Sequence, residues 1–247
     1  MKHLHLTAAA LALVAGPALA QQDTISIGMV LEPPNLDPTG GAAAAIDEGV
    51  YANVFEGLTR FGPDGSVQPA LAKDWDVSED GMVYTFYLNE GVTFHDGSEM
   101  NADDVVFSLD RARAEDSTNA QKALFAGIES VTAAGPLTVE VTLSEPNGNF
   151  PFNMAWGDAV IVAPESIDDI KTNPVGTGAF KFVNWTQGDS LQLERNPDYW
   201  GEAPVLEQAT FRFIADPTAA FAAVMAEDVD VFAGFPATEN LPQFEAD

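Results

Sequence analysis

Residues 75–111 read WDVSEDGMVYTFYLNEGVTFHDGSEMNADDVVFSLDR, and each part of this stretch predicts a definite local structure. Apolar and more polar side chains alternate over residues 84–89, which is the period-two pattern of a strand with one buried face. Gly91 is expected to interrupt the strand, and residues 92–94 resume it. His95-Asp96-Gly97 then predicts a tight turn, because glycine adopts positive φ cheaply and aspartate hydrogen-bonds its own backbone.

The end of the same stretch predicts a helix. Asn101 is a favourable N-cap, and Asp103 and Asp104 fall in the first turn, where the helix dipole favours carboxylates. Apolar residues that include Leu109 recur on one face. We expect this helix to end near Ala114.

These residues resemble the signature region of a known family. GVTFHDG (91–97) followed by ADDVVFSLDR (102–111) is similar to the bacterial extracellular solute-binding proteins of family 5, which are the dipeptide-, oligopeptide- and nickel-binding components of ABC importers. The VGTGxFxF turn and the RNPxYW end within residues 173–200 are a second hallmark of that family. Asn89 departs from the pattern, since the family usually has Lys or Arg at this position.

Residues 1–20 have the three parts of a signal peptide. Lys2 gives the positive start, an apolar core too short to span a bilayer follows, and Ala18-Leu19-Ala20 is a cleavage site. The alternative is a buried N-terminal helix. We expect export and maturation at Gln21, and because no cysteine follows the cleavage site, a freely soluble periplasmic protein without a lipid anchor.

The composition restricts the function. The formal net charge of −28 disfavours binding to nucleic acid or to anionic lipid, and it favours solubility and cationic ligands. A solvated acidic surface suited to salt is the alternative explanation of this charge. With no cysteine, the protein has neither disulfides nor thiolate metal sites, so its stability must come from a hydrophobic core.

The first strand is predicted at residues 23–30, and the rigid loop EPPNLDP follows it at 32–38. The family has an xxLDP loop here that contributes to one lip of the ligand cleft. By this resemblance Glu32, Pro34 and Asn35, together with the intervening Pro33, are candidate ligand-binding residues. A proline-rich structural turn is the alternative.

A helix is predicted from about residue 42 to 55, and its end resembles the tyrosine-containing helix end of the family. Tyr51 and Phe55 are therefore further candidates for the cleft. Trp156, in the apolar segment 153–163, is either an aromatic that faces the ligand or a core residue.

Further along the chain we predict a helix at residues 119–128 and a strand at 137–143. Gly176 and Gly178 indicate a backbone that has positive φ or lies close to another segment. A phosphate loop would need a further glycine and a lysine, which this segment lacks. Residues 210–232 read strand, helix, strand, which predicts a βαβ unit with a parallel pair of strands.

Catalytic chemistry has little support in the sequence. His95 beside Asp96 could form a dyad, but the turn interpretation is simpler, and no G-x-S-x-G motif is present. There is no HExxH motif, and with 38 acidic residues chance carboxylate pairs are uninformative. We therefore predict no catalytic residues, no metal site, no cofactor and no enzymatic activity.

The resemblance implies an α/β fold, namely a lobe of type-II periplasmic-binding topology with an inserted α+β subdomain and without the second lobe. We expect a discontinuous first-lobe core at 23–56 and 176–247, with the inserted subdomain at 57–175. Because family members are longer, we expect this chain to cover the first lobe alone.

The function that the resemblance implies is a periplasmic solute-binding protein, monomeric, that delivers di- or oligopeptides to the permease subunits of an ABC importer in the inner membrane. Other cargo, such as a nickel chelate, an oligosaccharide or an opine, is the alternative within the family. From outside the family, a secreted hydrolase that uses two carboxylates and an acidic envelope scaffold or chaperone stay open.

Overall fold

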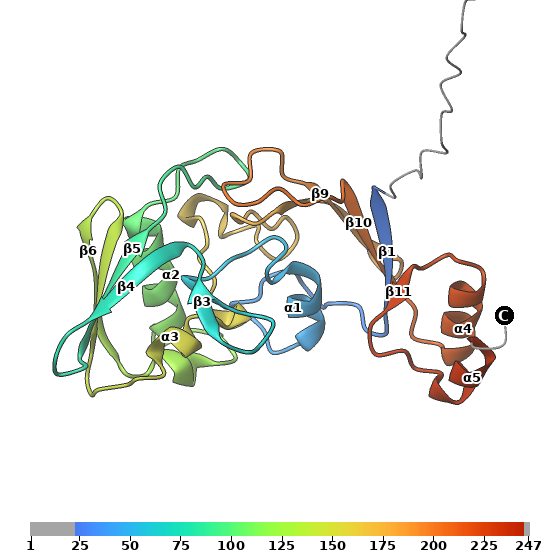
Figure 1. Ribbon diagram of the computed structural model, residues 1–247, viewed down its shortest axis with the longest axis horizontal. Coiled ribbons are helices and arrows are strands. Elements are labelled where there is room, and N and C mark those ends of the chain that lie inside the picture. Colours follow the sequence, from blue (N-terminus) through green and yellow to red (C-terminus); the bar gives the residue numbers. More distant parts are fainter. Residues whose placement is uncertain (1–22, 245–247) are drawn as a thin grey trace, which may run out of the picture.

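The computed structural model describes residues 23–244, and the predicted signal peptide lies outside this range. Figure 1 shows a four-stranded sheet at one end of an elongated molecule and a five-stranded sheet toward the other, with α1 (Ala44–Val50) between them. No helix among the described residues has both the length and the apolar character needed to cross a bilayer.

The five-stranded sheet has the order β11-β1-β10-β9-β8. β1 runs parallel to its neighbours β10 and β11, and β9 pairs antiparallel with both β10 and β8. The sequence correctly predicted parallel strands here, but β10 and β11 are not adjacent, because β1 lies between them. The strands are β1 (Thr24–Met29), β8 (Phe180–Thr186), β9 (Ser190–Arg195), β10 (Gln208–Phe213) and β11 (Val231–Phe232).

The four-stranded sheet is antiparallel throughout, with the order β4-β5-β7-β6. The predicted alternation is confirmed in β5, whose Tyr84, Phe86 and Leu88 are buried while the residues between them are partly exposed. The strands are β4 (Ala72–Val77), β5 (Val83–Leu88), β6 (Ile128–Gly135) and β7 (Thr138–Leu143). Residues 92–94 do not resume the strand. They form a loop, although Val92 and Phe94 are buried in the same core.

Helix α2 (Ala102–Arg113) begins at the predicted N-cap and ends at the predicted place. The Asn101 side chain accepts a hydrogen bond from Asp103 N, and the Asp104 carboxylate accepts one from Asn101 N, which is a complete capping box. The turn before it is confirmed as well. Gly97 has a φ of 90°, and the Asp96 carboxylate accepts a hydrogen bond from Ser98 N.

The other elements are short. A hairpin joins β2 (Thr59–Phe61) to β3 (Val67–Pro69), and Asp216 caps α4 (Pro217–Met225) by accepting a hydrogen bond from Ala219 N. The remaining helical turns are η1 (Lys122–Phe125), α3 (Phe150–Asn153), η2 (Gly157–Ala159), η3 (Pro164–Ser166), η4 (Thr238–Asn240) and α5 (Leu241–Phe244).

Two predicted helices were too long. The helix predicted at 42–55 ends at Val50, because Ala52 adopts a left-handed φ of 58° and the chain then turns through Phe55. In place of a helix at 119–128 there is only the single turn η1. A long-range contact contributes to this difference. Asn119 Nδ2 donates a hydrogen bond to the carbonyl of Asp158, which holds the start of the segment against η2.

The two hydrophobic cores meet at one extended segment, residues 159–163. Along residues 159–163 the side chains alternate between them: Ala159, Ile161 and Ala163 belong to the core of the four-stranded sheet, and Val160 and Val162 to that of the five-stranded sheet. This explains the unbroken apolar run in the sequence, since an extended segment buried on both faces needs no polar residue. The division into a core at 23–56 and 176–247 and a subdomain at 57–175 stays a prediction.

The VGTG turn lies against the end of the α1 segment. A Cβ atom added to Gly176 would lie 2.0 Å from Val54 O, and one added to Gly178 would lie 2.2 Å from Asn53 O. Neither glycine has a positive φ. Close approach of two backbones is thus the reason for these glycines.

Candidate functional site

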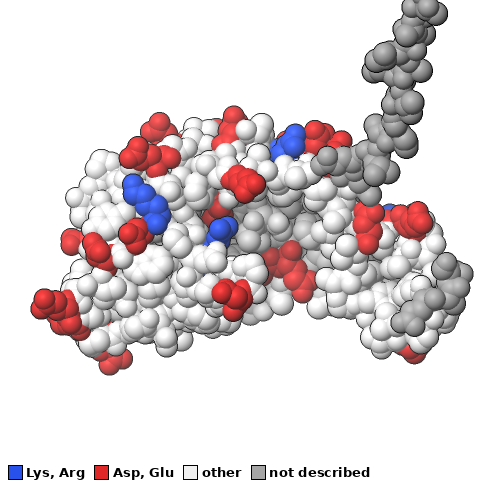
Figure 2. All heavy atoms as spheres, viewed as in Figure 1, with Lys and Arg blue, Asp and Glu red and all other residues white. Residues whose placement is uncertain are grey.

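Acidic side chains are spread over the molecule, and Figure 2 shows a hollow in the middle of one face, between the larger part and the part that carries α4 and α5. The described residues contain no group of three or more His, Asp or Glu side chains that could hold a metal ion. Candidate functional groups must therefore be sought among pairs of polar side chains and exposed aromatic rings.

The most perturbed carboxyl pair is Asp47 on α1 and Asp158 in η2. Burial, and then the negative charge of Asp158, raises the pKa of Asp47 to about 6. Burial also raises the pKa of Asp158. Gly157 permits this approach, because a Cβ atom there would lie 2.5 Å from Asp47 Oδ1. Within residues 23–244 the Asp47 carboxylate has no hydrogen-bond donor and no cation as a partner.

Aromatic residues flank this pair. The Tyr51 hydroxyl donates to Ala155 O, and burial followed by the charge of Asp47 raises its pKa. Trp156 is 38% exposed and Phe152 41%, although ring contacts with centroids 5.0–6.2 Å apart join both of them to Phe61. Trp156 precedes Gly157, whose backbone lies against the Asp47 carboxylate, so an exposed aromatic residue and the carboxyl pair belong to one short region of the fold.

A second cluster of polar side chains lies where the loop after β1 meets the end of α2. Asp37 is fully buried, and its carboxylate accepts hydrogen bonds from Thr39 N at 2.9 Å and from Arg111 Nη2 at 3.1 Å. Asn35 Oδ1 in turn accepts a hydrogen bond from Asp37 N. A cavity of about 240 Å³ beside this cluster is lined by Thr39, Arg111, Ala114, Asp116, Ser117 and Thr118.

The predicted ligand-binding residues occupy different environments. Glu32 Oε1 accepts hydrogen bonds from Trp185 Nε1 and Gly188 N, both at 3.0 Å, so this carboxylate anchors the loop to the β8–β9 turn. Pro34 is exposed, and Phe55 is fully buried in the core of the five-stranded sheet.

The structure places Tyr51 beside two other candidates. Its hydroxyl donates to the carbonyl of Ala155, the residue before Trp156, and its backbone forms a bridge with that of Phe55. Sequence reasoning missed Asp47 and Asp158. The available signal was weak: Asp158 is the one charged residue within the apolar run 153–163.

His95 forms no dyad with Asp96. Its ring lies against the VGTG turn (residues 175–178). Nε2 is 2.9 Å from Gly178 O, and Nδ1 accepts a hydrogen bond from Gly176 N. Burial lowers the pKa of His95 to about 4, so the ring is neutral. The turn interpretation is therefore confirmed, and the histidine joins two segments of the fold.

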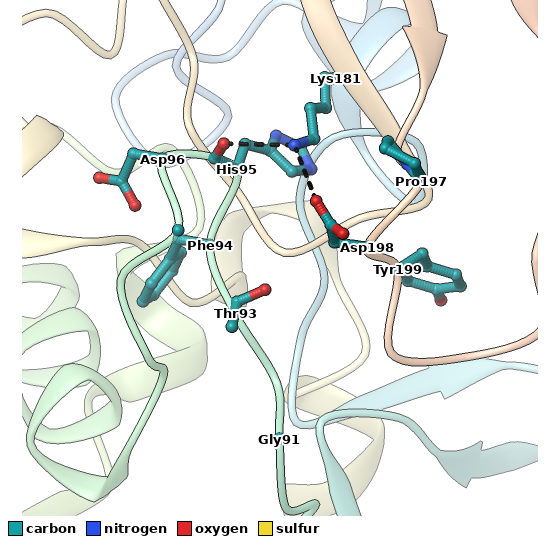
Figure 3. Close-up of a pocket in the computed structure, with 10 residues that line it drawn as sticks. Gly91, Thr93, Phe94, His95, Asp96, Lys181, Pro197, Asp198 and Tyr199 are labelled. Carbon is teal, nitrogen blue, oxygen red and sulfur yellow. Dashed lines mark hydrogen bonds and ion pairs between the residues drawn. The ribbon is translucent and has the colours of Figure 1, made fainter.

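Figure 3 shows the cavity of about 600 Å³ beside this ring. Lys181 Nζ lies 3.4 Å from His95 O and 4.0 Å from Asp198 Oδ2. The cation of this cavity is thus already engaged by protein oxygens.

The carboxyl pair yields a prediction on stability. Because folding raises the pKa of Asp47 from 3.8 to about 6, ionisation destabilises the folded state progressively as the pH rises through this window. Asp47→Asn should therefore increase the free energy of unfolding at pH 7, by about 1 kcal/mol after allowance for solvent screening of a half-buried group, and leave it nearly unchanged below pH 4.

Urea denaturation at pH 7 and pH 3.5 measures this effect. Glu48→Gln, on the exposed side of the same helix, is the matched control and should change little at either pH. Equal effects of Asp47→Asn at the two pH values would contradict the assignment.

Comparison with known proteins gives consistent matches. The family model described as bacterial extracellular solute-binding proteins, family 5, matches residues 66–247. A curated relative, the glutathione-binding protein GsiB of Pectobacterium atrosepticum, is 36% identical over 211 residues, which are 83% of this chain and 40% of the relative.

Solved structures agree. The periplasmic binding protein DppA from Helicobacter pylori, in complex with the peptide STSA, superposes with a TM-score of 0.81 at 27% identity over 91% of this chain and 49% of its own. NikZ from Campylobacter jejuni, in complex with Ni(L-His), gives 0.78 at 29% identity, over 85% and 43%. The predicted α/β fold of type-II periplasmic-binding topology is confirmed. The chain spans less than half the length of these relatives.

Proposed function

Because this chain belongs to the bacterial extracellular solute-binding proteins of family 5, we propose that it forms one lobe of a periplasmic protein that binds peptides and delivers them to an ABC importer. The family match over residues 66–247 is the observation that carries this proposal. The names of its relatives support peptide as the cargo, since one binds glutathione and another was solved with the peptide STSA.

The surface around Tyr51, Trp156, Asp47 and Asp158 is the part of this lobe that fits a peptide best. A peptide carries an ammonium group, which complements the Asp47 carboxylate and its neighbour Asp158, and side chains, which can pack on the exposed aromatic rings. Of the loop residues, Pro34 and Asn35 stay candidate contacts, and Glu32 supports them by fixing the loop. Phe55 is buried in the core of the five-stranded sheet, so it supports the site by packing and does not contact the ligand.

Transport requires that ligand binding changes the conformation. A ligand shifts the population toward a closed state only as far as it binds that state more tightly than the open one. The closed protein then docks on the permease. No turnover is expected, and the ligand is released unchanged.

A thermal-shift screen of the full protein tests this function. It should include glutathione, di- and oligopeptides, nickel–histidine, oligosaccharides and opines, and a true ligand at a hundred times its dissociation constant should stabilise the fold by about 2.7 kcal/mol. We expect the largest shift with peptides. If nickel–histidine gave the largest shift, the cargo would instead be assigned as a metal chelate like the one in the NikZ structure.

Matched variants locate the site. Asp47→Asn and Trp156→Ala should each weaken the binding of the active ligand by about tenfold, since each removes a charge or an aromatic contact. Asp168→Asn, an exposed carboxylate outside this surface, should not. Recovery of a chemically altered ligand, detected by mass spectrometry, would instead support the hydrolase.

A further inference from the structure

A further cavity of about 400 Å³ lies between the β2–β3 hairpin, the start of β4 and the loop after β9. We call it the Arg60–Lys73 pocket. None of the residues assigned above to the ligand surface lines it. Its lining residues are Glu56, Arg60, Pro69, Ala70, Lys73, Asn89, Tyr199, Trp200, Gly201 and Glu202.

The cations of this pocket are unusual for so acidic a protein. The sequence has 10 basic against 38 acidic residues, so carboxylates are abundant near every cation. Within residues 23–244, four basic side chains do pair with a carboxylate, namely Arg111, Arg113, Lys181 and Arg195. Arg60 and Lys73 share one cavity, yet among the described residues neither has a carboxylate oxygen within 4 Å or a hydrogen-bond partner.

Arg60 and Lys73 reach the cavity from strands of two different sheets, β2 and β4. Arg60 is the exposed central residue of β2, between the buried Thr59 and the partly buried Phe61. Lys73 lies where the β4–β5 register shifts between Ala72 and Asp74, which is a β-bulge. Bulges of this kind re-aim a side chain and are frequent beside binding sites.

The carboxylate inside the pocket is already satisfied. Glu56 accepts hydrogen bonds from three neutral donors: Thr177 Oγ1 at 2.9 Å, Tyr199 Oη at 2.8 Å and Trp200 Nε1 at 2.9 Å. Burial raises its pKa, although these donors and the positive charge of Arg60 act to lower it. Glu56 lies near enough to feel the charge of Arg60, but among the described residues it forms no ion pair within 4 Å with Arg60 or Lys73, so both cations keep their hydrogen-bond donors for another group.

We propose that the Arg60–Lys73 pocket binds a small soluble dianion, with inorganic phosphate or a dicarboxylate as the chemical class. The guanidinium supplies a planar fork that matches carboxylate or phosphate oxygens, and the ammonium supplies a second point charge. Since the pocket is separate from the proposed peptide surface, the site does not depend on the peptide assignment.

Isothermal titration of the full protein with phosphate and with succinate, a dicarboxylate, at low ionic strength, tests the site. We expect saturable 1:1 binding, and at least about tenfold weaker binding by the double variant Arg60→Gln, Lys73→Gln. The matched control Lys122→Gln, Lys171→Gln removes the same net charge elsewhere and should bind within about twofold of the wild type.

Glu202, another carboxylate that lines the pocket, provides a variant that should strengthen binding. Glu202→Gln removes a like charge from the pocket and should tighten binding of the same anion by a few fold. Absence of binding by the wild type, equal losses in the test and control variants, or no gain from Glu202→Gln would each overturn the proposal.

Discussion

Gly176→Ala should destabilise the protein by about 3 kcal/mol or more, the largest effect expected from the addition of a single methyl group. The new Cβ atom would lie 2.0 Å from Val54 O and 2.8 Å from Val54 C. These are backbone atoms, which cannot rotate away as a flexible side chain would, so the two segments must separate. Separation would also strain the hydrogen bond from His95 N to Gly176 O, which is 2.9 Å long.

Thermal and urea denaturation measure this loss, with an expected decrease in Tm of about 10 °C for a chain of this size. Gly127→Ala is the matched control, because its φ is not positive and no atom lies within 4 Å of the added Cβ, so its stability should change by less than about 0.5 kcal/mol. Similar losses in both variants would mean that the cost comes from alanine itself and not from the contact.

Local chemistry was sufficient to predict much of this fold. The capping box at Asn101, the turn at Gly97 and the alternation through β5 depend on neighbours within a few residues, and all three are present. Long-range pairing was not predictable in the same way. Nothing within residues 210–232 indicates that β1 lies between the two strands of that unit.

The candidate site was less predictable than the fold. The raised pKa values of Asp47 and Asp158 arise chiefly from burial, and for Asp47 also from the charge of Asp158, more than a hundred residues away in sequence. In a chain with 38 acidic residues neither one stands out. Glu32 was selected by its place in a loop, but its role depends on two donors, Trp185 in β8 and Gly188 in the turn after it. Sequence patterns locate segments, whereas partners determine what a side chain does.

The second large effect concerns His95 and acid. Folding lowers the pKa of this histidine from 6.5 to about 4, chiefly through burial. Between these values the unfolded chain binds a proton that the folded protein does not, so the free energy of unfolding falls as the pH falls. The contribution is complete above pH 6.5, and up to about 3 kcal/mol is lost by pH 4. Protonation of Nδ1 would also remove the acceptor for Gly176 N.

His95→Gln isolates this contribution from the other titrating groups. Urea denaturation of both proteins from pH 7.5 to pH 4, at constant ionic strength, should show that the wild type loses about 3 kcal/mol more than the variant over this range. Because His95 is the one histidine among residues 23–244, its ring protons can also be followed directly by NMR, and they should show no protonation above about pH 5. Parallel stability curves, or a ring that titrates near 6.5, would show that the VGTG turn leaves the histidine accessible to water and does not hold it neutral.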